Sequence, residues 1–257
     1  MTKQHISFSE LKTWAECPYK HKLKYIDGIN GFTGNAFTAF GTAIHSVCEF
    51  IAKGELDPVD YDEHFDLAFL CELKKLEEKP ENQMIIKMRQ QGKEISPSVF
   101  PQLRQHFGNY EVFSTEEMLY ESIDELSYKW HLKGFIDLVI KTDDGKYHIL
   151  DWKSCSWGWD AKRRSEKLVT YQLTLYKKFF CKKHGIEPDD VDTHFGLLKR
   201  TAKDNKVEIF RVTSGKRKTT NATKLLVDGC RTIKAKNHIK NRNSCEKCEF
   251  LHTEHCH

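Results

Sequence analysis

The sequence has no long apolar run, no internal repeat and no low-complexity linker. No stretch approaches the ~18 consecutive apolar residues of a membrane-spanning helix, and the first residues lead into an amphipathic segment instead of an apolar signal peptide. The phosphate-binding pattern Gly-x-x-x-x-Gly-Lys-[Ser/Thr] is also missing, so the chain offers no P-loop. These absences predict a soluble cytoplasmic protein with no membrane partner.

The composition is that of a globular protein. The 257 residues are enough for one large domain, or for a domain with an appendage. With 39% hydrophobic and 30% charged residues, the chain can bury a substantial core. The net charge of +4 allows a nucleic-acid partner without requiring one.

The clearest local signal is in residues 134–154, which are predicted to form two strands joined by a tight turn. Apolar residues alternate with other residues at period two, as in half-buried strands. The turn is the three-residue loop 143–145, in which Gly145 takes the left-handed position that such a loop needs. The length of this loop fixes the register of the hairpin.

The predicted register brings two carboxylates together. If 142 lies opposite 146, then Asp137 lies opposite Asp151 with Cβ atoms roughly 5 Å apart, and Lys153 points to the same face. Two opposed carboxylates repel each other, and a divalent cation would remove this repulsion while using both as ligands. The lysine could then stabilise a reacting phosphate. The alternative is a surface hairpin with scattered charges and a slightly different register.

A histidine is the next candidate ligand. His45 lies beside an apolar helical stripe that includes Phe37, and it follows Gly41 by one turn. Because Gly41 has no side chain, a metal site or another backbone can approach closely there. A hydrogen-bonded core histidine would give the same pattern.

Gln172 and Tyr176 form a further polar pair. Their spacing of four places them on one face of a predicted helix that stops at Gly185. They could hydrogen-bond a catalytic lysine, a water or a DNA phosphate, or be a polar pair at the edge of a buried helix.

Cysteines gather at the end of the chain. There are nine in all, an odd number, and three lie in the last thirteen residues. Cys245 and Cys248 have a strong metal-ligand spacing. With Cys256 they need a fourth partner, for which Cys17 at a predicted helix break is available. In a reducing compartment this clustering favours metal or iron–sulfur ligation over disulfides. A free reactive tail is one alternative, and a zinc site using a tail histidine is another. The candidate histidines for that zinc site are His252, His255 and His257.

The rest of the sequence predicts helices and short strands. Pro80, Gly92, Pro97 and Pro101 are expected to interrupt the mixed-charge helical region. Helices are expected near 7–17, 37–51, within 61–116, at 165–184 and at 219–236, with strands near 117–126, 193–200 and 206–213.

In this order, the motifs resemble the RecB-type branch of the PD-(D/E)xK nucleases, and more narrowly its small iron–sulfur members found in phages and in CRISPR adaptation. The resemblance spans residues 17 to 256. It implies a restriction-endonuclease-like α/β fold in a single domain, with a mixed central sheet flanked by helices. A helical insertion at 61–116 and a cysteine-rich tail at 237–257 are expected within it. The sequence departs from the family pattern at Ile136, where proline is common, at Asp151, where glutamate is common, and in a longer gap before Cys256.

The resemblance also implies roles for residues. His45, Asp137 and Asp151 would bind Mg²⁺ or Mn²⁺, with the imidazole favouring Mn²⁺. Lys153 would position or activate the attacking water. The implied catalytic residues are Asp137, Asp151, Lys153, Gln172 and Tyr176. The implied ligands of a structural [4Fe–4S] cluster, which would join the N-terminal helix to the tail, are Cys17, Cys245, Cys248 and Cys256.

The implied function is metal-dependent hydrolysis of DNA phosphodiesters, as an exonuclease or end-processing enzyme in recombination or repair, in a bacterial or phage-infected cell. Single-stranded DNA or duplex ends are the expected substrates. Because the helicase domain of the large RecB proteins is missing, a helicase or recombination protein is an expected partner. A structure-specific endonuclease or nickase, a non-catalytic DNA-binding iron–sulfur module and a zinc-stapled interaction protein are the alternatives.

DNA contacts are expected from two basic segments and one aromatic loop. Solvated charge runs are the alternative for the basic segments. The loop is Trp157–Trp159, and the segments are Lys162, Arg163 and Arg164, followed by Lys216, Arg217 and Lys218.

Overall fold

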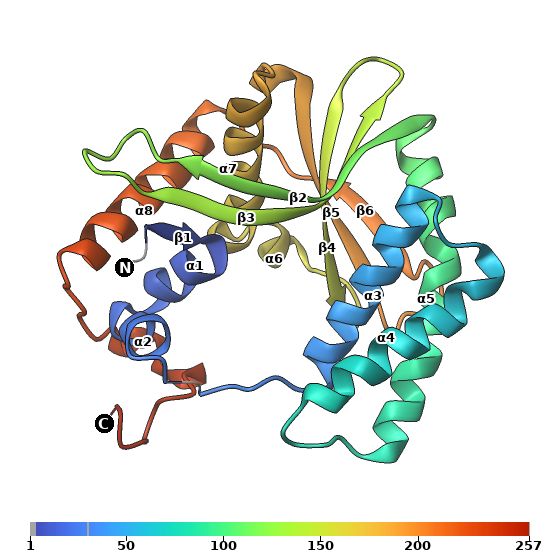
Figure 1. Ribbon diagram of the computed structural model, residues 1–257, viewed down its shortest axis with the longest axis horizontal. Coiled ribbons are helices and arrows are strands. Elements are labelled where there is room, and N and C mark those ends of the chain that lie inside the picture. The colour runs from blue at the N-terminus through green and yellow to red at the C-terminus, as the bar shows by residue number, and fades with distance from the viewer. Residues whose placement is uncertain (1–3, 30, 257) are drawn as a thin grey trace.

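The protein folds as a six-stranded mixed β-sheet with helices on both faces (Figure 1). The computed structural model describes residues 4–29 and 31–256. The strands are β1 (His5–Ser7), β2 (Tyr110–Ser122), β3 (His131–Thr142), β4 (Tyr147–Cys155), β5 (Val191–Lys199) and β6 (Val207–Arg211). The α-helices are α1 (Phe8–Glu16), α2 (Pro18–His21), α3 (Ala36–Lys53), α4 (Tyr61–Lys75), α5 (Asn82–Phe107), α6 (Ala161–Ser165), α7 (Lys167–His184) and α8 (Lys216–Lys234). Shorter helical turns are η1 (Lys22–Ile26), η2 (Pro58–Asp60), η3 (Pro188–Asp190) and η4 (Arg242–Lys247).

Strand β3 organises the sheet because it pairs with three other strands. β2 runs antiparallel to it along its whole length, from His131 to Thr142. A strand has only two hydrogen-bonding edges, so β1 and β4 must share the other edge. β1 pairs in parallel with residues 131–133, and β4 pairs antiparallel with residues 138–141. A stretch of β3 from Gly134 to Asp137 is left between these two partners.

The hairpin of β3 and β4 has the predicted register. Gly145 takes a positive φ of 83°, and the Thr142 N–H donates to the Lys146 carbonyl oxygen at 3.0 Å. Leu138 is paired with Leu150, so the next step along both strands leads to Asp137 and Asp151. The turn chemistry alone was enough to predict this register, and the two carboxylates directly follow the last residue pair of the ladder.

Two hydrophobic cores lie on opposite faces of the sheet. Val139 and Ile149 pack toward α7, α8 and α1, whereas Leu138 and Leu150 pack toward α3, α4 and α5. This alternation follows from the period of two along each strand. In Figure 1 the two groups of helices stand on either side of the sheet. No helix in the described ranges is long and apolar enough to cross a membrane.

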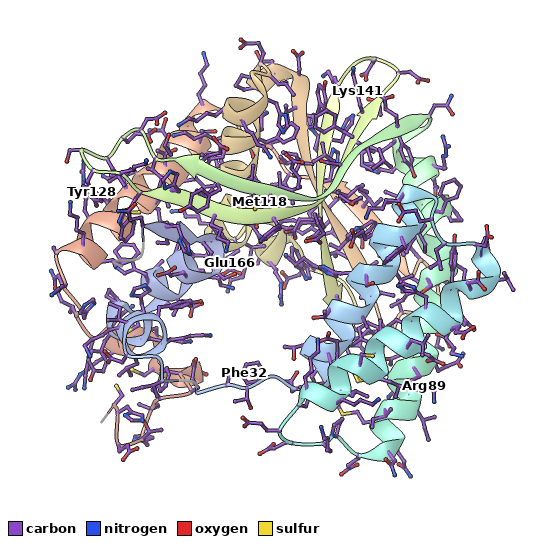
Figure 2. All side chains as sticks on the ribbon, viewed as in Figure 1. Phe32, Arg89, Met118, Tyr128, Lys141 and Glu166 are labelled. Atoms are coloured by element: carbon purple, nitrogen blue, oxygen red, sulfur yellow. The ribbon has the colours of Figure 1, made fainter. Side chains whose placement is uncertain are left out.

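Helices α4 and α5 are joined by close packing and by an ion pair. A Cβ at Gly92 of α5 would lie 2.1 Å from the Phe65 ring of α4, so the glycine lets the two helices approach each other. Arg89, labelled on these helices in Figure 2, donates two hydrogen bonds to the Asp66 carboxylate, at 3.0 and 2.7 Å. The two helices therefore cover α3 as one layer.

The helical region differs from its prediction in two places. α5 runs without a break through Gly92, Pro97 and Pro101. Both prolines lie on the exposed side of the helix, where water can satisfy the carbonyl groups that they leave unpaired. Strand β2 begins at Tyr110 instead of 117, so the end of the predicted helical insertion is strand. The glutamates of this strand hid the pattern, since one of them, Glu117, does not face solvent but pairs with Lys183 and His184 of α7.

Two other expectations are wrong in detail. α8 begins at Lys216, so the second basic segment is the first turn of the helix instead of a loop before it. Phe37 starts α3 but is 45% exposed, because it lies one turn before the stripe that the sheet covers. The helix expected at 165–184 is α7, and it ends as predicted at Gly185 with φ 64°.

The C-terminal tail packs against the N-terminal helices (Figure 1). The Asn241 side chain donates to the Glu16 carbonyl oxygen at 2.8 Å, and the Tyr19 hydroxyl donates to the His255 carbonyl oxygen at 3.2 Å. Lys20 and Glu249 form an ion pair at 2.9 Å. The two ends of the described chain are therefore held together by polar contacts.

Candidate active site

Asp137 sits where β3 and β4 separate. Its Oδ2 accepts the Trp152 N–H at 2.7 Å, which continues the ladder through a side chain instead of a backbone carbonyl. His45 of α3 approaches the same oxygen, with 3.6 Å between Nδ1 and Oδ2. The sequence predicted both residues at one site, and the structure brings them together.

Asp151 is the most enclosed group of the site, with a side chain only 2% exposed. The Lys153 ammonium forms an ion pair with its Oδ2, and the Gln172 amide donates to its Oδ1 at 2.9 Å. The same amide lies 3.2 Å from the Tyr176 hydroxyl. Gln172 therefore links the carboxylate of β4 to the face of α7 that carries Tyr176.

Gly134 makes room for Tyr176. A Cβ at this position would lie 2.9 Å from the Tyr176 ring, which is closer than van der Waals contact. Any side chain here would push the ring, and with it the hydroxyl beside Gln172, away from β3. The glycine is thus needed for the close approach of α7 to the stretch of β3 that lies between β1 and β4.

Burial sets the protonation of the site. Poor solvation raises the pKa of Asp137 to about 6, and it raises the pKa of Asp151 to about 6 as well, although the Lys153 charge acts in the opposite direction. The pKa of His45 is lowered to about 4 by burial and by the same lysine. At neutral pH the imidazole is therefore neutral and keeps a lone pair for a ligand.

Lys153 stays charged despite its surroundings. Burial lowers its pKa, but Asp151 and Asp137 more than compensate, and the pKa lies above the ordinary value of 10.5. An ammonium with so high a pKa cannot act as a general base near neutral pH. The charged ammonium can instead bind an anionic oxygen or orient a water molecule.

Two further carboxylates were missed by the sequence reasoning. Glu49 follows His45 by one turn of α3 and accepts from the Thr115 hydroxyl at 3.3 Å. Glu116 takes a positive φ of 47° at the position of β2 opposite Asp137. Both negative charges help to raise the pKa of Asp137. Glu49 was detectable as a helical i, i+4 partner of His45, whereas nothing in the sequence placed Glu116 there.

The donor set fits a divalent cation in its chemistry. Two poorly solvated carboxylates and a neutral imidazole lie together, and the Lys153 ammonium offsets part of the repulsion between the carboxylates. Oxygen and imidazole donors suit Mg²⁺ and Mn²⁺. Across the residues that the structure describes, however, no group of three or more His, Cys, Asp or Glu side chains is placed so that it could hold a metal ion.

The four predicted cluster ligands line one cavity. Cys17, Cys245, Cys248 and Cys256 surround a space of about 240 Å³ between α2 and the tail. All four are free thiols, and Cys17 Sγ accepts the Asn241 N–H at 3.3 Å. The structure thus brings together cysteines more than two hundred residues apart in the chain. Of the alternative zinc ligands, His257 lies outside the described residues.

The predicted DNA contacts divide into two groups. Trp157 is 75% exposed and is available for stacking, but Trp159 is 7% exposed and packs against Phe195 in the core. The expectation for Trp159 was therefore wrong, because its ring packs against Phe195 and Phe210 instead of facing solvent. Arg164, Arg217 and Lys218 line one pocket, whereas Lys162, Arg163 and Lys216 are exposed outside it.

Comparison with known proteins identifies the family. A family model for the PD-(D/E)XK nuclease superfamily matches residues 5–253. The chain belongs to this superfamily and is a nuclease, and the observed sheet with its two helical layers confirms the predicted fold class. The narrower RecB-type and iron–sulfur assignments stay predictions.

A solved structure with low sequence identity shows the same fold. A "Putative exonuclease" from Eubacterium rectale is similar with a TM-score of 0.59 and 14% identity over 96% of this chain and 87% of that one. The crystal structure of SSO0001 gives a TM-score of 0.46 and 14% identity, covering 97% of this chain and 85% of that one. No curated protein matches the sequence.

Proposed function

We propose that the protein is a metal-dependent deoxyribonuclease that processes DNA ends. The observation that supports this most directly is the pair Asp137 and Asp151, which interact electrostatically where β3 and β4 separate, with the Lys153 ammonium paired to Asp151. A superfamily of nucleases supplies the reaction class, and two poorly solvated carboxylates beside an ammonium are groups that can hold a cation and a phosphate oxygen.

The residues of the site have different proposed roles. Asp137, Asp151 and neutral His45 would hold Mg²⁺ or Mn²⁺, which when bound supplies Lewis-acid polarisation of the phosphate and an acidified water. The Lys153 ammonium is placed to take a non-bridging phosphate oxygen or to orient the water. Gln172 fixes the rotation of the Asp151 carboxylate through its 2.9 Å hydrogen bond. Tyr176, whose pKa burial raises, remains a hydroxyl donor.

Action on ends is supported by the motif resemblance and by the name of the Eubacterium rectale structure. The test compares linear with covalently closed circular DNA, each single-stranded and duplex, in Mg²⁺, in Mn²⁺ and in EDTA. Release of short products from linear DNA alone supports an exonuclease. Cutting of closed circles would establish the endonuclease or nickase alternative instead. Binding without cleavage in either metal would establish the non-catalytic module.

We also propose that the cysteine cavity holds a [4Fe–4S] cluster with a structural role. This proposal is supported by four free thiols that line one cavity, which is the number of cysteine ligands that such a cluster takes. We assign the cluster no catalytic step, because its proposed ligands lie between α2 and the tail, whereas Asp151 lies on β4. A helicase or recombination protein would supply unwound DNA to the nuclease.

His45→Ala is expected to weaken cleavage through lower metal occupancy. The imidazole lies 3.6 Å from Asp137 and is the proposed nitrogen ligand, so its loss leaves the two carboxylates to hold the ion. Cleavage in Mg²⁺ should fall by about 10–100-fold, and high Mn²⁺ should restore part of it. The measurement is the cleavage rate as a function of metal concentration. An unchanged metal dependence would place His45 outside the metal site.

Asp137→Asn is expected to stabilise the metal-free protein at alkaline pH. The unfolded carboxyl ionises near pH 4, whereas burial keeps it protonated to about pH 6 in the fold. The wild type therefore loses stability as the pH rises through this window, whereas the variant, whose amide does not ionise, keeps it. The gain should be roughly 1–3 kcal/mol above the folded pKa and absent below the unfolded one.

This gain is measured as the difference in melting temperature between variant and wild type, in EDTA, at pH about 4 and pH about 8. Asp189→Asn, an exposed carboxyl on η3, serves as the control and should show no such window. A variant that melts below the wild type at the higher pH would show that the ionised Asp137 is a stabilising group.

A further inference from the structure

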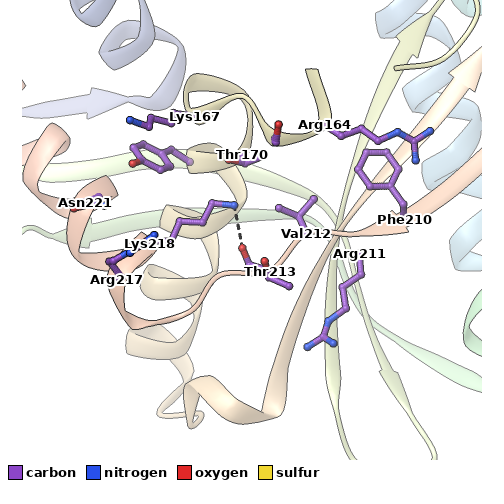
Figure 3. A pocket seen from close by; sticks show the side chains of 12 residues that line it. Arg164, Lys167, Thr170, Phe210, Arg211, Val212, Thr213, Arg217, Lys218 and Asn221 are labelled. Carbon is purple, nitrogen blue, oxygen red and sulfur yellow. Dashed lines mark hydrogen bonds between the residues drawn. The ribbon is translucent and has the colours of Figure 1, made fainter. Parts of the chain in front are cut away.

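A concave pocket of about 620 Å³ lies at the start of α7 and α8, beside β6 (Figure 3). Side chains from α6, α7, β6 and α8 line it. Figure 3 shows Lys167, Arg217 and Lys218 on one side and Arg164 stacked on the Phe210 ring across from them. The sequence had marked Arg164 and the 216–218 segment as separate basic runs, and the fold joins them.

The pocket has a surplus of positive charge. None of its lining residues is acidic, and neither Lys167 nor Arg217 makes a hydrogen bond or ion pair with any residue that the structure describes. Lys218 donates only to the Thr213 carbonyl oxygen, at 2.9 Å, and its burial lowers its pKa. Arg164 and Arg211 are the exceptions, since they pair with Glu208 and with Asp192, each at 2.6 Å and each outside the pocket lining.

Backbone groups add to this charge. The first turns of α7 and α8 both contribute lining residues, among them Lys167 and Arg217. Neither helix receives a side-chain cap, because Gly215 has no side chain and Glu166 makes no capping bond. Their first N–H groups have no intrahelical acceptor, and two helix dipoles point their positive ends at one space. The site therefore suits a small, strongly negative ligand with several oxygens.

The pocket lies close to the proposed catalytic groups. Its Tyr171 directly precedes Gln172 on α7. On the sheet, the Phe195 ring lies 6.0 Å from the Lys153 ammonium and 6.0 Å from the Phe210 ring of the pocket. The buried Phe195 ring thus neighbours both Lys153 of the candidate active site and Phe210 of the pocket.

We propose that this pocket binds the terminal phosphate of a nucleic-acid strand. The choice of a nucleic-acid ligand rests on the proposed function, whereas the positively charged lining of the pocket is observed independently of it. A terminal phosphate carries close to two charges and three free oxygens, whereas a backbone phosphodiester carries one charge and two. Cations that converge on a point suit the terminal group, since contacts to a continuous backbone are spread along a track.

The test measures binding of the full-length protein to short single-stranded oligonucleotides in EDTA, so that no cleavage intervenes. The probes are identical except for a 5′-phosphate, a 3′-phosphate or hydroxyls at both ends. Lys167→Gln with Arg217→Gln is the pocket variant. Lys177→Gln with Lys224→Gln is the matched control, since it removes the same charge from the same two helices at positions outside the pocket lining.

One phosphorylated probe should bind the wild type about tenfold or more tightly than the hydroxyl-ended probe. This preference should disappear in the pocket variant and persist in the control. Equal affinity of the wild type for all three probes would overturn the proposal. A loss in the pocket variant that is equal for every probe would assign the pocket to internal phosphates and overturn the terminal-phosphate assignment.

The outcome is separable from that of the proposed function. If the wild type prefers a phosphorylated end but cuts no DNA in Mg²⁺ or Mn²⁺, the pocket stands and the proposed activity fails. If it cuts DNA with no preference for phosphorylated ends, the activity stands and the pocket assignment fails. The preferred probe would also identify the strand end that the enzyme engages.

Discussion

Asp151→Ala is expected to lower the rate of DNA cleavage by about three orders of magnitude or more, with little change in fold. The side chain is 2% exposed and bonds both Lys153 and Gln172. Its removal takes away one proposed metal ligand and the counter-charge that holds the lysine over the site. Asp137→Ala and Lys153→Ala should have effects of similar size, because each removes a different part of the same arrangement.

The measurement is the single-turnover cleavage rate of linear DNA, with a thermal melt of each variant to confirm folding. Asp189→Ala, which removes an exposed carboxyl on η3, is the control and should cleave at the wild-type rate. If Asp151→Ala cleaves like the wild type in both Mg²⁺ and Mn²⁺, the catalytic assignment of this hairpin is wrong.

Cys17→Ser is expected to cost the protein its iron and much of its stability. A cluster that joins Cys17 to the tail would close a loop of more than two hundred residues, and in the loop-entropy treatment of cross-links such a closure contributes on the order of 5 kcal/mol. The melting temperature should fall by about 10 °C or more. Both termini should become accessible to protease, and cleavage should decline with the fold.

Cys71→Ser is the control, because Cys71 is exposed on α4 far from the tail cavity. Both variants are purified without oxygen and compared by iron and zinc content, visible absorption and limited proteolysis. Full iron in Cys17→Ser would remove Cys17 from the ligand set. Zinc without iron in the wild type would favour the zinc-stapled alternative.

Local chemistry made the centre of the fold predictable. Gly145 and a three-residue loop determine the register of β3 and β4, and from this the positions of Asp137 and Asp151 follow by counting. The spacing of four residues likewise sufficed to predict that Gln172 and Tyr176 lie on one face of α7. That face meets the sheet, where Gln172 bonds Asp151. These predictions depend only on residues close in the sequence.

Features that depend on distant segments were not predictable in the same way. The sequence does not show that β2 lies along the whole of β3, so the place of Glu116 opposite Asp137 was hidden. The break expected at Pro97 did not occur, because its exposed side leaves the carbonyl to water. The separation of the buried Trp159 from the exposed Trp157 was decided by the packing of Phe195 and Phe210.

The three-residue turn at 143–145 also limits how this chain can tolerate insertions and deletions. A change of one residue there would shift β4 against β3 by one position and turn Asp151 and Lys153 to the opposite face of the sheet. The same change between α4 and α5 would lengthen only an exposed connection. We therefore expect sequences that keep this site to vary in length at the helices, while the short turn keeps its length.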